Sequence, residues 1–232
     1  IYASNGLFDN SKQLLKDAKK AYSLGFRVYK MRVIDPDTIS DLVKSFNKKF
    51  KNRMQLIVDA VQGSSANPWA TKVSINLAKK LEREEIVFLE EPCRVENIKG
   101  YKDIKKFSTL NIAGAESIPT ARAFKKYLEE DVFDILQFDI ATSGFIEGRR
   151  ICDLAYIHNK PVAIHSWGSA ISIMAGIHLG LTVPNVAFTE YCFMDHPINK
   201  ELFENKTIKI NNGCTPRPNC HGLGVHFKDI LS

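Results

Sequence analysis

The chain has 232 residues, 44% of them hydrophobic, and a formal net charge of +6, which is enough apolar material for one large core. It contains no run of about 18 apolar residues, no recognisable signal peptide and no C-x-x-C pair among its five cysteines, which argues against a membrane span, secretion, a zinc site and a disulfide framework. The lysines fall mostly on predicted helix faces without a nucleic-acid-binding motif, so we expect a soluble, cytoplasmic protein that binds neither nucleic acid nor membrane.

Short apolar runs alternate along the chain with segments of helical spacing. The predicted strands are 1–4, 28–33, 56–59, 87–90, 111–116, 134–139, 161–165 and 186–191. The predicted helices lie between them, at about 10–24, 36–51, 69–84, 96–107, 119–130, 145–159 and 169–181. Eight strands separated by seven helices, without hairpin spacing, predict an α/β fold, a parallel (β/α)7β TIM-type barrel over residues 1–191, rather than an open doubly wound sheet. Residues 192–232 have weak periodicity and predict a tail that packs back, with a hairpin turn at 211–213.

Three of the predicted strands end on a carboxylate. The run Leu56-Ile57-Val58 leads to Asp59, and the runs that end at Glu90 and Glu116 repeat the pattern. Each carboxylate follows the previous one by about one strand, one helix and two loops. Active sites of such barrels lie at the C-terminal edge of the strands, so these three side chains can converge on one point.

Three converging carboxylates indicate a cation. They offer hard oxygen ligands, which suit one Mg²⁺ ion, and without a cation they would repel one another and raise each other's pKa. Glu91 competes with Glu90 for the second ligand position. Because alternation along a strand sends neighbouring side chains to opposite sides, only one of the two can bind.

The remaining strand ends also carry titratable groups. These are Lys30 and Arg32, Asp139, His165 and Glu190. Asp139 and His165 lie one β/α unit apart, so neighbouring strands would bring them side by side. A carboxylate bonded to one ring nitrogen fixes the imidazole tautomer and leaves the other nitrogen basic, which is the arrangement expected of a general base.

Together these residues resemble the enolase superfamily, in its mandelate racemase and muconate lactonizing enzyme branch. The motifs that carry the likeness are, in chain order, Gly25-Phe26, Lys30-Met31-Arg32, Val58-Asp59, Glu90-Glu91-Pro92, Glu116, the Asp139 and His165 pair, and Glu190. The segments His165-Ser166-Trp167-Gly168-Ser169 and Glu190-Tyr191 look most like acid-sugar dehydratases and lactone cycloisomerases.

The resemblance implies an Mg²⁺-dependent enzyme that removes the proton α to a carboxylate and stabilises the resulting enediolate. It implies Asp59, Glu90 and Glu116 as metal ligands, His165, Asp139, Lys30, Arg32 and Glu190 as catalytic residues, and Lys30, Arg32, Trp167 and Glu190 as substrate-binding residues. Arg32 departs from the second lysine of the family's K-x-K motif, and a guanidinium is a poor general base. Family members also begin with an α+β capping domain, whereas this chain starts at the first barrel strand.

We therefore expect dehydration of a sugar acid, such as an aldonate or aldarate, by a homo-oligomer whose partner is a small carboxylate substrate. The alternatives are cycloisomerisation of a sugar lactone, racemisation or epimerisation as in the same family, and a non-catalytic barrel that binds an acid sugar or serves as a scaffold. Cycloisomerisation would use the same site residues as dehydration, whereas racemisation would need a second base, which Arg32 is poorly suited to supply.

Overall fold

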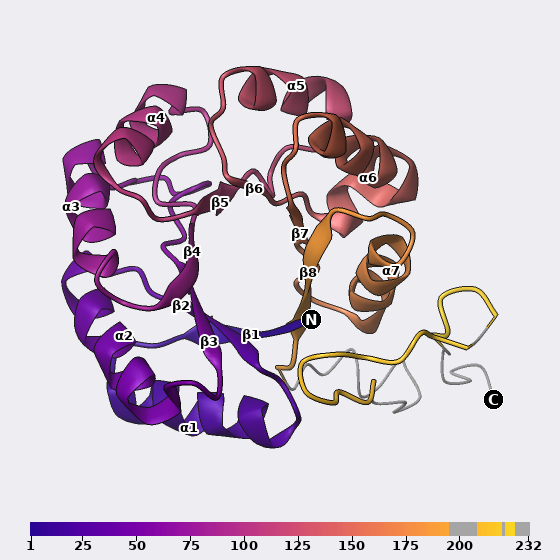
Figure 1. The fold of residues 1–232 in the computed structure, drawn as a ribbon, viewed down its shortest axis with the longest axis horizontal. Helices are drawn as coiled ribbons and strands as arrows, with labels where there is room; N and C mark the ends of the chain where they lie inside the picture. Colours follow the sequence, from indigo (N-terminus) through magenta and orange to yellow (C-terminus); the bar gives the residue numbers. More distant parts are fainter. Residues whose placement is uncertain (195–207, 220, 226–232) are drawn as a thin grey trace.

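A computed structural model describes residues 1–194, 208–219 and 221–225 of the chain. Eight parallel strands, β1 to β8 in sequence order, close into a barrel, and helices α1 to α7 surround it as a ring (Figure 1). The strands are Tyr2–Leu7, Val28–Arg32, Gln55–Asp59, Ile86–Glu90, Ile112–Gly114, Ile135–Leu136, Val162–Ile164 and Val186–Cys192. The helices are Ser11–Ser23, Pro36–Phe50, Thr71–Leu81, Ile98–Phe107, Ala121–Glu129, Ile140–Ile157 and Ala170–Gly180. The predicted (β/α)7β barrel is confirmed.

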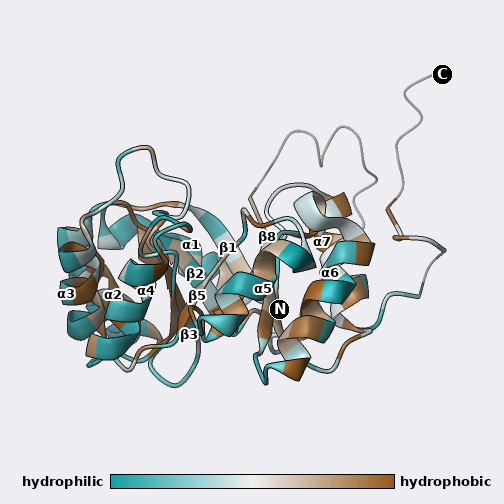
Figure 2. Cartoon of the chain, turned by 90° about the horizontal axis from the view of Figure 1, so that it is seen from above, coloured by the Kyte–Doolittle hydropathy of each residue, from teal (hydrophilic) through white to brown (hydrophobic). Residues whose placement is uncertain are grey.

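The barrel interior begins with a layer of apolar side chains, which we call the apolar floor. It contains one buried residue from each of the first seven strands and a partly buried residue from β8: Tyr2, Val28, Ile57, Phe88, Ala113, Ile135, Ala163 and Phe188. A second, larger cluster lies between the strands and the helices. In Figure 2, hydrophobic colour follows the strands, whereas hydrophilic colour predominates on α2 to α4. Because side chains alternate along a strand, the next inward layer lies two residues further on, at the C-terminal strand ends.

The helix termini follow ordinary capping chemistry. The Asn10 side chain accepts a hydrogen bond from the Gln13 backbone N–H at the start of α1, and Gly25 closes that helix with a φ of +99°, as predicted. A side chain at position 25 would also collide with the tail, because its Cβ would lie 2.3 Å from the Ile210 carbonyl oxygen. The predicted turn in the tail forms between Asn211 and Cys214, which pair as an antiparallel bridge.

Two predicted strands are shorter than expected. The fifth ends at Gly114, so Glu116 lies in the following turn. The sixth ends at Leu136, and Asp139 instead forms an isolated bridge with His165. Helix α6 is assigned from Ile140 to Ile157 but is interrupted by non-helical backbone at Gly144, at φ +67°, so the helix that we predicted after Gly144 is its second part. The first part, from Ile140, is capped by the Asp139 side chain, which accepts from the Thr142 N–H. No helix in the described ranges is long and apolar enough to span a membrane.

Candidate active site

The charged residues occupy the inward layer next to the apolar floor, at the C-terminal strand ends. Lys30, Asp59, Glu90, His165 and Glu190 each follow a floor residue of the same strand by two positions. Strand register supports this grouping, because Arg32 pairs with Asp59 and Asp59 with Glu90 across neighbouring strands. The alternation of each strand therefore places the apolar floor and the polar layer in the same barrel interior.

Lys30 lies at the centre of the polar layer and is fully buried. Its Nζ lies 2.7 Å from Glu90 Oε1, 3.0 Å from Glu190 Oε1 and 3.6 Å from Asp59 Oδ2. Burial alone would lower the pKa of Lys30, but the charges of Glu190 and Glu90 outweigh it and raise that pKa well above its usual value. Lys30 is therefore held as an ammonium and is poorly suited to accept a proton in this arrangement.

Arg32 extends the network toward the mouth of the barrel. Its Nε lies 3.2 Å from Asp59 Oδ2 and its Nη2 lies 3.2 Å from Glu190 Oε1. The guanidinium also stacks on the Trp167 ring, with its central carbon 3.7 Å from the ring centroid, a cation–π contact. Trp167 thus contacts the charged network through the Arg32 guanidinium.

His165 and Asp139 form the predicted pair. Nδ1 of His165 lies 2.6 Å from Asp139 Oδ2, while Nε2 lies 3.0 Å from Glu116 Oε2 and 3.4 Å from Glu190 Oε2. Burial lowers the pKa of His165, but the charge of Glu190 and the hydrogen bond to Asp139 outweigh it and raise the pKa to about 9. Burial likewise opposes ionisation of Asp139, yet the hydrogen bond and charge of His165 hold the pKa of Asp139 below its usual value.

One contact network thus joins all nine predicted site residues. Glu116, placed in the turn after β5, enters it through His165 Nε2. Glu190 connects the two halves, because one of its oxygens contacts Lys30 and Arg32 and the other contacts His165. Despite complete burial, the cations Lys30, His165 and Arg32 lower the pKa of Glu190, so this carboxylate remains charged.

Glu90 and Glu91 separate as alternation predicts. Glu90 contacts Lys30, whereas Glu91 Oε1 accepts a hydrogen bond from the Ala115 backbone N–H at 3.2 Å. Burial and the nearby charge of Asp59 raise the pKa of Glu90 to about 8, and its Oε2 is a buried oxygen with no hydrogen-bond partner. Such an unpartnered oxygen beside a second carboxylate is suited to a cation.

The three candidate ligands fit a hard cation by donor chemistry. Asp59, Glu90 and Glu116 offer carboxylate oxygens, and Glu90 Oε2 is unsatisfied. In the part of the chain that the structure describes, however, no three acidic, histidine or cysteine side chains are grouped closely enough to form a metal cluster. Lys30 and His165 lie among the carboxylates instead, contacting Glu90 and Glu116 respectively.

Sequence reasoning missed two residues that hold the network in place. Ser166 donates its backbone N–H to Glu190 Oε2 at 3.2 Å and its hydroxyl to the Glu190 carbonyl oxygen at 2.6 Å. The Asn5 carbonyl oxygen accepts a hydrogen bond from Arg32 Nη1 at 2.8 Å. The Asn5 carbonyl and the Ser166 N–H are main-chain atoms, which any residue type supplies, so residue identity gave no signal for these two contacts. The Ser166 hydroxyl is a side-chain group, but spacing along the sequence did not indicate its partner Glu190.

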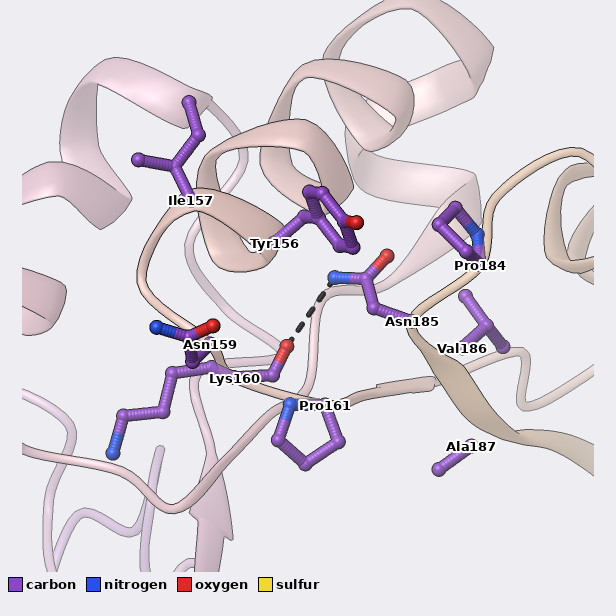
Figure 3. A pocket seen from close by; sticks show the side chains of 9 residues that line it. All are labelled: Tyr156, Ile157, Asn159, Lys160, Pro161, Pro184, Asn185, Val186 and Ala187. Atoms are coloured by element: carbon purple, nitrogen blue, oxygen red, sulfur yellow. Dashed lines mark hydrogen bonds between the residues drawn. The ribbon is translucent and has the colours of Figure 1, made fainter.

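A separate cavity of about 630 Å³ lies at the opposite, N-terminal ends of β7 and β8 (Figure 3). Its lining is Tyr156, Ile157, Asn159, Lys160, Pro161, Pro184, Asn185, Val186 and Ala187. At this cavity the Asn185 side-chain amide donates a hydrogen bond to the carbonyl oxygen of Lys160 at 3.2 Å. None of these nine residues belongs to the charged network.

Comparison with known proteins identifies similar chains. The family model described as "Enolase C-terminal domain-like" matches residues 13–230. Arabinonate dehydratase of Saccharolobus solfataricus is 24% identical over 234 residues, covering 98% of this chain and 61% of that protein. D-xylonate dehydratase of Haloferax volcanii is 31% identical over 150 residues, covering 64% of this chain and 36% of that protein.

Among solved structures, the 3,6-anhydro-D-galactonate cycloisomerase of Zobellia galactanivorans superposes with a TM-score of 0.83 at 30% identity. The match covers 97% of this chain and 62% of that one. The chain thus spans less than two thirds of the length of each of these relatives.

Proposed function

Since the chain belongs to the enolase C-terminal domain-like family, we propose that it removes the proton α to the carboxylate of a sugar acid and dehydrates that acid through an enediolate. The observation that carries this proposal is the His165 imidazole, bonded to Asp139 at 2.6 Å and facing Glu116 and Glu190 with its other nitrogen. The similarity to sugar-acid dehydratases supports the choice of substrate class.

His165 serves as the base and then as the acid. Despite burial, Glu190, Asp139 and Glu116 raise the pKa of His165 to about 9. The imidazole is therefore mostly protonated at neutral pH, and Nε2 is left unprotonated at higher pH or when Glu116 holds a cation. Asp139 then accepts from Nδ1–H, the lone pair of Nε2 takes the α-proton, and Asp139 stabilises the imidazolium that forms. The C–O bond to the β-hydroxyl then breaks, and the proton on Nε2 passes to that oxygen, which leaves as water. The enol product rearranges to a 2-keto acid, so atoms and charges balance.

Three carboxylates form the proposed metal site. Asp59, Glu90 and Glu116 would hold one Mg²⁺ ion, whose charge when bound would stabilise the enediolate oxygens. Their donor type fits this ion, as does the buried, unpartnered Glu90 Oε2. Lys30, Arg32 and Glu190 then bind the substrate's polar groups, with Trp167 supporting the Arg32 guanidinium.

Among Lys30, Arg32 and His165, only His165, with a pKa raised to about 9, loses its proton within reach of neutral pH, whereas the pKa values of Lys30 and Arg32 are raised above already high usual values. A single group able to act as a base favours dehydration over racemisation. Racemisation needs proton removal on one face and delivery on the other, and Arg32 stays protonated at neutral pH. Its charge is reinforced here, because Glu190 and Asp59 outweigh burial and raise the pKa of Arg32. Abstraction by His165 alone is enough for dehydration.

The test is turnover of a panel of aldonates with Mg²⁺, followed by detection of the 2-keto acid. His165→Asn is expected to lower turnover by at least about 100-fold while Mg²⁺ binding is retained. Undiminished turnover would place the base elsewhere. In D₂O, NMR of unreacted substrate should not show both α-deuterated epimers accumulating; if both accumulate, a second base is present.

Cycloisomerisation of a sugar lactone is the second candidate. The 30% identity to a cycloisomerase of anhydro-galactonate supports it, and it uses the same α-proton abstraction. Product NMR separates the two reactions, because dehydration yields a 2-keto acid with loss of water whereas cycloisomerisation conserves the substrate's composition. If neither product forms with any acid sugar tested, the barrel is a binding or scaffold protein.

A further inference from the structure

Backbone strain is concentrated at the strand ends that carry the three carboxylates. In the described ranges, the residues with positive φ that are not glycine, asparagine or aspartate are Val61, Glu91 and Ala115, at 55°, 42° and 87°. They follow β3, β4 and β5. A positive φ is rare for such residues and for β-branched valine above all, and it persists only where the surroundings enforce it.

Glu91 contacts each of the three strained turns. Its carbonyl oxygen accepts from the Gln62 N–H at 2.9 Å in the turn after β3, and its own N–H donates to Ala113 of β5 at 3.0 Å. Its side-chain Oε1 accepts from the Ala115 N–H at 3.2 Å. Ala115 immediately precedes Glu116, so this last bond holds the Gly114–Ala115 peptide, one residue before the third carboxylate.

The residues packed around the Glu91 side chain, including Gly63 and Gly114, leave little space beyond what that side chain occupies. A Cβ added to Gly63 would lie 1.7 Å from Glu91 Oε2 and 2.1 Å from its carboxyl carbon, and one added to Gly114 would lie 3.2 Å from Glu91 Cγ. Glu91 itself is only 4% exposed. Gly63 therefore provides the space that the Glu91 carboxyl group occupies.

We infer that Glu91 is a positioning residue that holds the turns after β3, β4 and β5 and thereby sets the relative placement of Asp59, Glu90 and Glu116. Its effect on cation binding rests on the proposed function, whereas its effect on the Ala115 peptide does not. The role differs from that of Glu90, whose carboxylate contacts Lys30.

The experiment compares Glu91→Ala, Glu91→Gln and Gly63→Ala with the exposed control Glu129→Ala. Mn²⁺ serves as the probe, with affinity from calorimetry and ligand geometry from its EPR spectrum. Glu91→Ala is expected to weaken Mn²⁺ binding by about 10- to 100-fold, the range for groups that orient metal ligands. Glu91→Gln keeps an acceptor oxygen of the same reach and should restore most of the affinity. Gly63→Ala should weaken it, and Glu129→Ala should not.

Hydrogen exchange of the Ala115 amide in metal-free protein gives an independent readout. It is expected to speed up about tenfold or more in Glu91→Ala but not in Glu91→Gln. Wild-type Mn²⁺ affinity together with an unchanged Ala115 exchange rate in Glu91→Ala would overturn the inference. If the unmutated chain binds no divalent cation, the proposed function fails and the exchange rate alone decides the inference. If Glu91→Ala does not fold, the Mn²⁺ affinities of the other two variants decide. The inference is overturned if Glu91→Gln loses as much Mn²⁺ affinity as Gly63→Ala does.

Discussion

Replacement of Lys30 by methionine tests whether the buried charges stabilise one another. Lys30 is fully buried among Glu90, Glu190 and Asp59, all within 3.6 Å of its Nζ. Removing one partner of a buried ion pair leaves uncompensated charge and typically costs about 3–5 kcal/mol. A chain of 232 residues has an unfolding entropy of roughly 0.5 kcal/mol per degree at its midpoint. Lys30→Met should therefore lower the melting temperature by about 6–10 °C.

The assay is thermal unfolding by circular dichroism in chelator-treated buffer, with Lys99→Met as the matched control. Lys99 lies 2.8 Å from Asp103, but 87% of its side chain is exposed, so its loss should shift the midpoint by about 1 °C or less. Adding Mg²⁺ should raise the midpoint of Lys30→Met more than that of the unmutated chain, because bound cation charge replaces the missing ammonium. A Lys30→Met midpoint within about 1 °C of the unmutated chain would refute the reasoning.

Three further substitutions test the site, the packing and the thiols. Glu116→Gln should weaken Mg²⁺ binding measured by calorimetry, by about tenfold or more, while the circular dichroism spectrum is unchanged; equal affinity would remove Glu116 from the ligand set. Gly148→Ala should destabilise the chain by about 1–3 kcal/mol in urea unfolding, since its Cβ would lie 2.8 Å from both Phe138 Cε2 and Leu179 Cδ2; an unchanged midpoint would mean that both side chains move aside freely. Burial raises the pKa of Cys152 to about 12, so at lower pH Cys152 of the folded protein should resist alkylation while the exposed Cys214 reacts. Mass spectrometry of the alkylated Cys214→Ser variant checks this expectation. Labelling of Cys152 in the folded protein at pH 8 would contradict it.

The order of the strands and the residues at their ends could be predicted from sequence because both follow from periodicity. Asp59 and Glu90 end their strands as expected, and the alternation rule separated Glu90 from Glu91. Periodicity could not show where β6 ends, because Asp139 can end a strand or cap a helix. The hydrogen bond from Thr142 to its side chain decided the second outcome.

Contacts made across the barrel were also beyond sequence reasoning. The stacking of Trp167 on Arg32 joins residues from distant parts of the chain, and spacing along the sequence carries no information on such a pair. The positive φ of Val61 is equally hard to predict, because valine prefers extended backbone; in the structure the Val61 N–H donates to Asp59 Oδ1 at 2.8 Å. The sequence therefore identified the titratable groups, while their partners required the fold.

The apolar floor has a consequence for molecular traffic through the barrel. Tyr2, Ile57, Phe88 and their neighbours are buried and fill the interior between the charged layer and the N-terminal strand ends. Within the described residues, the buried floor separates the charged layer from the N-terminal strand ends, so access to that layer is expected from the C-terminal rim. Under the proposed function, product and substrate would use the same route, so inhibition by product should be competitive.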